Sequence, residues 1–285
     1  MQHPRTGVVA SLAGVLLLSA LTAAQNTAPA PRSPWKYYPE DARANVGPGG
    51  PAPVRDLTGT WAGESSGAGV KQPVRPENPP PLTPLGQKMF DGNKAESRGT
   101  LIADSNDPHL RYCDPFGFPR NMNDQIRSLT IATLPNRTFL MIAFQSIWRE
   151  AWTDGRALPT TFAGRGPAVH DPTYNGYSVG RWEDDYTFVI DTTGMAPETW
   201  ASEGGLPHSV DARVTERFRR SSRNDMTLTM TMDDPKLYTR TLKLGEIYFR
   251  WIPSQTFYNT TCIPSTLQRY LKEMADPAGS PTAAR

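Results

Sequence analysis

The chain has 285 residues, a formal net charge of +2 and only two cysteines. Its 30 basic and 28 acidic side chains form no clustered basic run, which argues against nucleic acid or an anionic membrane surface as a partner. After the N-terminal segment, no stretch reaches the roughly 18 apolar residues that a membrane-spanning helix needs. We therefore expect no membrane span.

The first 24 residues have the pattern of a secretory signal peptide. Arg5 precedes an uncharged run from Gly7 to Thr22, and small residues up to Ala24 offer a cleavage site. Cleavage near Ala24 predicts an exported protein, periplasmic or secreted. Residues 25–56 are rich in Pro and Gly and are expected to form a flexible tether, and residues 275–285 a disordered tail.

The two cysteines, Cys113 and Cys262, would sit in an oxidising compartment if the protein is exported. The expected outcome is one disulfide that ties an early segment to the end of the chain. The alternative is a nucleophilic or metal-binding thiol.

Between residues 57 and 274 the pattern is mostly strand and turn, which predicts one β domain. We expect strands at 56–63, 128–134, 138–152, 178–182, 186–192, 210–220, 226–232 and 239–252, with a further one at 255–262. Two short helices are expected, one that opens at Thr83-Pro84 and one over 264–274. Residues 107–120 are expected to be a loop.

The segment 138–152 is read as a single strand. Alternation then places Trp148, Glu150 and Trp152 on one face and Arg149 on the other. Asp154-Gly155 is a hairpin turn signal, so the chain is expected to return antiparallel. A strand that carries aromatic bulk beside charge is typical of a pocket wall.

Seven or eight strands joined by short hairpins predict an all-β, antiparallel barrel. Gly59-x-Trp61 resembles the first strand of a lipocalin-like (calycin-type) barrel, whose Trp closes one end. An eight-stranded barrel has an interior just wide enough for one small ligand. The expected fold is thus a ligand-holding barrel with a Pro-rich N-terminal extension and a short C-terminal helix.

Several blocks, taken together, resemble a family of exported bacterial proteins without assigned activity. The blocks are Cys113-Asp-Pro-Phe-Gly-Phe-Pro-Arg120, Trp148-Arg-Glu-Ala-Trp-Thr-Asp-Gly-Arg156, Gly176-Tyr-Ser-Val-Gly-Arg-Trp-Glu183, Leu206-Pro-His-Ser209, Arg213-Val-Thr-Glu-Arg-Phe-Arg-Arg220 and Asp233-Asp-Pro-Lys-Leu-Tyr-Thr239. The family looks lipocalin-like. The resemblance implies a fold and an exported localisation, and it implies no particular reaction.

The familiar catalytic and cofactor signatures are missing from the sequence, so no cofactor is expected. His208 is the best candidate for proton transfer, with Asp211 or Glu216 to orient its ring and Glu150 as a further carboxylate. The alternative is a loop histidine that bonds to backbone. Nothing in the spacing of the histidines supports a metal site.

A second set of side chains is suited to holding a ligand. Its members are Trp148, Arg149, Asp154, Arg156, Tyr177, Arg181, Trp182 and Arg217. If they face inward, the arginines form a polar floor for a hydroxyl or carboxylate and the aromatic rings form the wall. The alternative is packing for the rings and cross-strand ion pairs on a solvated face for the charges.

These observations favour an exported barrel, monomeric or weakly dimeric, that binds a small and partly apolar molecule. The alternative is a cofactor-free lyase, isomerase or hydrolase that uses His208 and strand carboxylates for proton transfer. A surface interaction module that works through the Pro-rich tether ranks below both.

Overall fold

The computed structural model describes residues 49–63, 71, 73–123, 126–162, 169–253, 255 and 260–279. The predicted signal peptide, residues 25–48 of the predicted tether and residues 280–285 lie outside the described residues. By its contacts the chain divides into Met1–Lys36 and Tyr37–Arg285, and every described residue belongs to the second unit.

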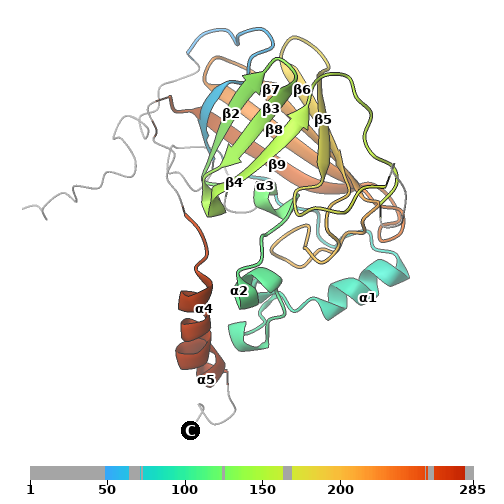
Figure 1. The fold of residues 1–285 in the computed structure, drawn as a ribbon, viewed down its shortest axis with the longest axis vertical. Helices are drawn as coiled ribbons and strands as arrows, with labels where there is room; N and C mark the ends of the chain where they lie inside the picture. The colour runs from blue at the N-terminus through green and yellow to red at the C-terminus, as the bar shows by residue number, and fades with distance from the viewer. Residues whose placement is uncertain are drawn as a thin grey trace, which may run out of the picture. The chain divides into compact units, whose positions relative to one another are not determined.

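The described residues contain a closed barrel of nine strands, paired in chain order (Figure 1). The strands are β1 Gly59–Ala62, β2 Ser128–Leu134, β3 Arg137–Ile142, β4 Ile147–Trp152, β5 Tyr177–Trp182, β6 Thr187–Thr193, β7 Arg213–Arg220, β8 Asp225–Asp233 and β9 Leu242–Trp251. The β-barrel prediction is therefore confirmed. The segment 255–262 forms no strand in its described residues.

The prediction of a wholly antiparallel barrel is wrong at one junction. Strands that alternate in direction cannot close a ring of nine without one parallel pair, and that pair is β4–β5. Asp154-Gly155 does not make a hairpin; instead the chain returns to the other end of the barrel before β5 begins at Tyr177. The β4–β5 pairing consists of two residue pairs, Ala151–Ser178 and Trp152–Val179.

The single strand expected over 138–152 is in fact a hairpin. A short 3₁₀ turn, η5 (Phe144–Ser146), separates β3 from β4, and Gln145 and Ser146 both have positive φ. The turn reverses the chain. Leu140 of β3 is buried inside the barrel and pairs with Arg149 of β4, so Trp148 points outward.

Side chains pack the middle of the barrel. Inward-facing residues of different strands form one buried cluster that includes Trp61, Leu140, Ile190, Phe218 and Leu228. The strands predicted at 210–220 and 226–232 are confirmed as β7 and β8, and every second side chain of each is buried. In the described residues this packed cluster therefore occupies the interior for which the sequence predicted a ligand.

Trp61 lies fully buried at the end of the barrel where β1 begins. Its indole Nε1 donates to the Leu57 carbonyl at 2.9 Å, and the Arg220 guanidinium stands 4.8 Å from the centre of its ring. Arg220 also donates to the carbonyls of Asp56 and Arg223. These contacts anchor the segment before β1 across this end of the barrel.

Short helices gather at the opposite end (Figure 1). They are α1 Pro84–Gly92, α2 Pro108–Tyr112, α3 Arg120–Asn123, α4 Pro264–Tyr270, the π-helical turn η6 Leu271–Ala275 and α5 Asp276–Ala278. The helix predicted to open at Thr83 is confirmed, because the Thr83 hydroxyl caps α1 by accepting from the Gly86 amide. The predicted C-terminal helix is confirmed as α4. The loop expected over 107–120 is wrong, since α2 and the start of α3 lie within it.

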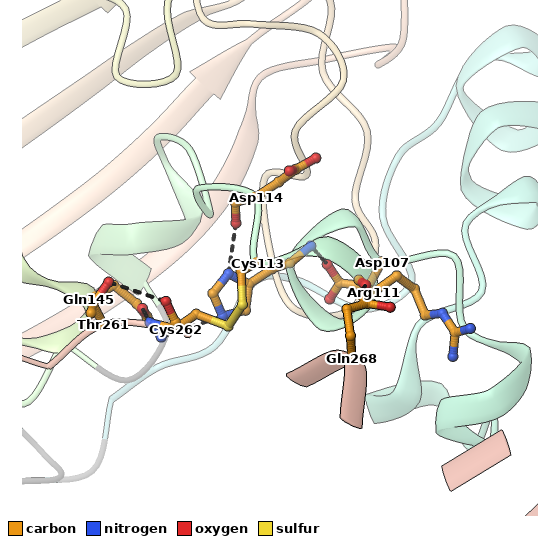
Figure 2. The surroundings of a disulfide bond; sticks show 9 residues. Asp107, Arg111, Cys113, Asp114, Gln145, Thr261, Cys262 and Gln268 are labelled. Atoms are coloured by element: carbon orange, nitrogen blue, oxygen red, sulfur yellow. Dashed lines mark hydrogen bonds between the residues drawn. A yellow bond between two sulfur atoms is a disulfide. The ribbon is translucent and has the colours of Figure 1, made fainter. Parts of the chain in front are cut away.

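The predicted disulfide is confirmed between Cys113 and Cys262, which are 149 residues apart in sequence. Figure 2 shows Gln145 beside it, where the Gln145 side-chain oxygen accepts from the Cys262 amide at 2.6 Å. Thr260 adds further bonds, donating to the Ala143 carbonyl and accepting from the Gln145 amide. The segment near Cys262 therefore holds the η5 turn that sets the start of β4.

Candidate functional site

The β4–β5 junction is a short seam in the barrel wall and the only parallel one among the described strands. Two residue pairs join its strands, as many as join β1 to β9. The strands part on both sides of these pairs. One gap lies among the residues that precede Ala151 and Ser178, and the other among those that follow Trp152 and Val179. Each gap holds a cleft.

The first cleft, which we call the side cleft, has a volume of about 540 Å³. It is lined by Pro115, Ser146–Glu150, Trp152 and Thr173–Ser178. Four residues predicted for the site, Trp148, Arg149, Glu150 and Tyr177, are brought together here. Arg149 and Ser178 are its most deeply buried members, whereas Trp148 and Tyr174 are exposed.

The second cleft, which we call the mouth cleft, lies at the end of the barrel where β1 begins and has a volume of about 570 Å³. It is lined by Arg55, Leu57, Thr133–Pro135, Thr138, Thr153, Gly155, Gly180–Trp182 and Phe188. The predicted residues Arg181 and Trp182 are found here. Gly180 has a local reason to be glycine, since a Cβ at this position would lie 2.5 Å from the Phe188 ring.

Arg149 and Glu216 form an ion pair inside the barrel. The Arg149 guanidinium donates to both Glu216 carboxylate oxygens, at 3.1 and 2.9 Å, and the two side chains are 1% and 0% exposed. Arg149 also donates to the hydroxyls of Ser178 and Thr192, and its guanidinium lies 3.6 Å from the centre of the Phe118 ring. Of the charged set predicted for the site, this is the pair that the fold places in the interior.

The remaining predicted charges form ion pairs on outward-facing or exposed positions. Glu150 accepts from Arg137 at 3.0 Å, and Arg181 donates to Asp191 at 2.6 Å. The other two pairs join Arg156 to Asp154 within the turn after β4 and Arg217 to Glu183 across strands.

The arginine neighbours have an electrostatic effect at two of these carboxyls. The guanidinium of Arg156 lowers the pKa of Asp154. For Asp191, burial pushes the pKa upward, but hydrogen bonds from Arg213, Thr215 and Arg181 outweigh it, so the pKa is lowered.

The four predicted catalytic residues do not meet. His208 is fully buried, with its ring Nε2 2.9 Å from the Thr199 hydroxyl and Nδ1 3.3 Å from the Ser209 carbonyl. Burial lowers the pKa of His208, which favours the neutral form of the ring. Asp211 is paired with Lys236, and Glu216 and Glu150 are paired with arginines, so neither proposed partner orients the His208 ring.

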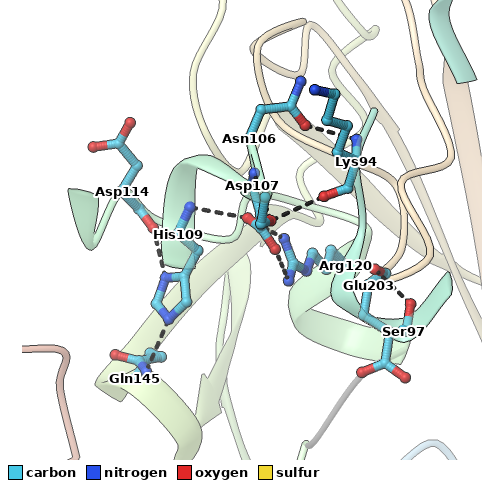
Figure 3. A network of polar contacts seen from close by, with 10 residues as sticks. Lys94, Ser97, Asn106, Asp107, His109, Asp114, Arg120, Gln145 and Glu203 are labelled. Carbon is cyan, nitrogen blue, oxygen red and sulfur yellow. Dashed lines mark hydrogen bonds and ion pairs between the residues drawn. The ribbon is translucent and has the colours of Figure 1, made fainter. Parts of the chain in front are cut away.

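A second buried network lies between the helices (Figure 3). Arg120 donates to both carboxylate oxygens of Asp107, at 2.9 and 2.7 Å, and Asp107 caps α2 by accepting from the His109 amide. His109 contacts the Asp114 carbonyl through Nδ1 at 2.7 Å, and burial lowers its pKa. These contacts join α2 to α3, so we interpret the network as structural support for the helices.

Two negative findings hold for the described part of the chain. No group of three or more His, Cys, Asp or Glu side chains is arranged to hold a metal ion there. Nor does any helix among those residues have the length and apolarity to cross a membrane.

The sequence did not point to several residues that shape the clefts. These are Tyr174 and Asn175 in the side cleft, and Leu57, Thr138 and Gly180 in the mouth cleft. Tyr174, Asn175 and Gly180 lie beside or within the Gly176–Glu183 block, which was their only signal. Leu57 and Thr138 had no signal, because they belong to distant segments that only the fold brings to the cleft.

In comparisons with known proteins, no family model matches the chain and no curated protein matches it significantly. The fold and the clefts define this protein as a closed, mixed β-barrel with two clefts beside its parallel β4–β5 seam.

Proposed function

We propose that this protein is an exported barrel that binds a small, partly apolar molecule in the mouth cleft. The observation that carries this proposal is the mixed lining of a cleft of about 570 Å³. Leu57, Trp182 and Phe188 supply apolar walls. Arg55 and Arg181 supply guanidinium groups that are paired with Asp185 and Asp191 but stay more than half exposed, so they can still donate to a ligand. Clefts of several hundred Å³ with apolar walls and a few polar groups are typical of small-molecule sites.

The proposed export is supported by the disulfide between Cys113 and Cys262, because such bonds persist in oxidising compartments. The predicted signal peptide points the same way. Membership of the lipocalin-like exported family is likewise proposed, on the closed barrel and on Trp61 buried at one barrel end beneath Arg220. The parallel β4–β5 pair is the feature that departs from that pattern.

The test uses 8-anilinonaphthalene-1-sulfonate, a fluorescent probe with an apolar body and one anionic group. Leu134 is exposed at the mouth cleft, so Leu134→Glu adds a repelling charge there without disturbing the core. Leu101→Glu is the matched control, because Leu101 is also an exposed leucine and lies in neither cleft. We expect probe fluorescence on the native protein, displacement by decanoate, and weakening by roughly tenfold in Leu134→Glu alone.

Absence of probe binding, or equal weakening by both substitutions, would refute the proposal. The protein for the titration is taken from the exported fraction of its host. Sequencing its N-terminus tests the proposed export, and a start near Gln25 is expected.

A further inference from the structure

The side cleft presents two aromatic rings to solvent. Trp148 of β4 is 61% exposed and Tyr174, in the turn before β5, is 38% exposed. Single exposed apolar side chains are normal on protein surfaces, but these two come from separate segments and line one cleft. An exposed indole is a large apolar surface that gains free energy when a ligand covers it.

The other two aromatic rings of the side cleft are already covered. Trp152 lies between the guanidinium groups of Arg137 and Arg156, which stand 3.8 and 3.5 Å from the centre of its ring. Tyr177 contacts the rings of Phe162 and His170, with centroid distances of 6.2 and 5.0 Å. The surface left for a ligand is therefore that of Trp148 and Tyr174.

Trp148 is also held in place. Its ring contacts Phe139 of the neighbouring strand β3, with centroids 6.2 Å apart. On the cleft side, the Trp148 carbonyl accepts from the Asn175 amide at 3.3 Å. The Phe139 contact restricts the indole and the Asn175 bond fixes the Trp148 backbone, and both reduce the ordering cost when a ligand stacks on the ring.

Fixed polar groups stand beside these rings. Asn175 accepts from the Asn121 amide at 2.8 Å, which orients the Asn175 side chain and leaves an N–H and a lone pair for a ligand. Glu150 accepts from Arg137 through one carboxylate oxygen, at 3.0 Å, and the other oxygen keeps acceptor capacity. Asn175 and Glu150 thus offer both a donor and acceptors next to an apolar ring.

This combination selects among ligand chemistries. A lipid chain needs an enclosed apolar channel, whereas the rim residues Trp148, Tyr174 and Thr173 are open to water. An anion needs an accessible cation, whereas the one arginine in the lining, Arg149, is buried and bonded to both carboxylate oxygens of Glu216. A pyranose ring has an apolar C–H face that stacks on an indole and a rim of hydroxyls that both donate and accept.

We propose that the side cleft is a binding site for a neutral saccharide chain, with a pyranose stacked on Trp148 and its hydroxyls bonded to Asn175 and Glu150. This site is separate from the mouth cleft, because the Ala151–Ser178 and Trp152–Val179 pairs lie between the two. The proposal does not rest on the function proposed for the mouth cleft.

The experiment titrates the full mature chain with cellohexaose, chitohexaose, mannohexaose and maltohexaose, by calorimetry and by tryptophan fluorescence. Trp148→Ala removes the platform, and its outward position means that the fold is retained, which circular dichroism verifies. Tyr112→Ala is the control, because Tyr112 is 66% exposed on α2 and lies in neither cleft. Binding of at least one hexaose is expected, weakened about tenfold or more by Trp148→Ala and unchanged by Tyr112→Ala.

Three results would overturn the proposal: no hexaose binds below about 10 mM, Trp148→Ala leaves the affinity unchanged, or both variants lose affinity equally. A bound hexaose that displaces anilinonaphthalene sulfonate from the mouth cleft would also overturn it, because the two clefts would then be one site.

Discussion

Replacing Glu216 by Gln breaks the buried ion pair inside the barrel while it keeps the shape of the side chain. The Arg149 guanidinium would then stay in a site where it is 1% exposed, without its anionic partner. At a separation near 3 Å the attraction between the two charges is about 5 kcal/mol for an effective dielectric constant near 20. Because an unpaired buried charge retains its desolvation penalty, we expect Glu216→Gln to lower the free energy of unfolding by about 3–5 kcal/mol.

The matched variant removes both charges, as Arg149→Met with Glu216→Leu. The hydroxyls of Ser178 and Thr192, which lose the Arg149 donor, are 2.8 Å apart and bond to each other. Well-packed apolar replacements of buried ion pairs are often neutral or stabilising. The double variant is therefore expected to lose no more than about 1 kcal/mol of unfolding free energy relative to the parent. Urea denaturation followed by tryptophan fluorescence measures both values. A loss under about 1 kcal/mol for Glu216→Gln, or a double variant less stable than the single one, would refute the reasoning.

Two further predictions concern pH and the disulfide. Burial lowers the pKa of His208 below its unfolded value near 6.5, so the unfolded chain takes up a proton that the folded chain refuses. The free energy of unfolding therefore falls as the pH drops below about 7, by up to roughly 1.4 kcal/mol per pH unit. His208→Gln should make this fall shallower. Urea denaturation at pH 7.5 and 5.5 measures it, and an equal loss of unfolding free energy in both proteins would contradict the prediction. His109, whose pKa burial also lowers, keeps its own contribution in both proteins. Replacing Cys113 and Cys262 together by Ser should cost about 3–5 kcal/mol, because the bond closes a loop of 149 residues in the unfolded chain. The same variant should raise amide exchange in the η5 turn, and unchanged exchange at Gln145 and Ser146 would show that the bond does not hold this turn.

The strands with a period of two were readable from sequence. In β7 Glu216 and Phe218 share a face, as do the methionines of β8, and these faces are buried. Alternation works there because both strands are regular and have one face against the core. The Thr83-Pro84 start of α1 and the disulfide were also readable, the former from capping chemistry and the latter because Cys113 has only one possible partner within the chain.

The β3–β4 hairpin was not readable, since its turn contains Gln145 and Ser146 at positive φ instead of Gly or Asn. Bonds from Thr260, more than 100 residues along the chain, compensate for that backbone conformation. A period-two pattern carried through such a turn places every later side chain on the wrong face. This is why the outward position of Trp148 came only from the tertiary structure.

The sequence by itself thus determined the regular strands and one helix cap, which are local features, and the pairing of the two cysteines, which have no other partner in the chain. Tertiary structure decided which charges are inside, because Arg149 and Arg181 both lie on strands and only the barrel distinguishes their faces. It also decided the parallel seam, since closure of nine strands is a property of the whole ring and of no single segment. Both clefts lie where β4 and β5 part beyond their two paired residues, and no local pattern encodes the length of that pairing.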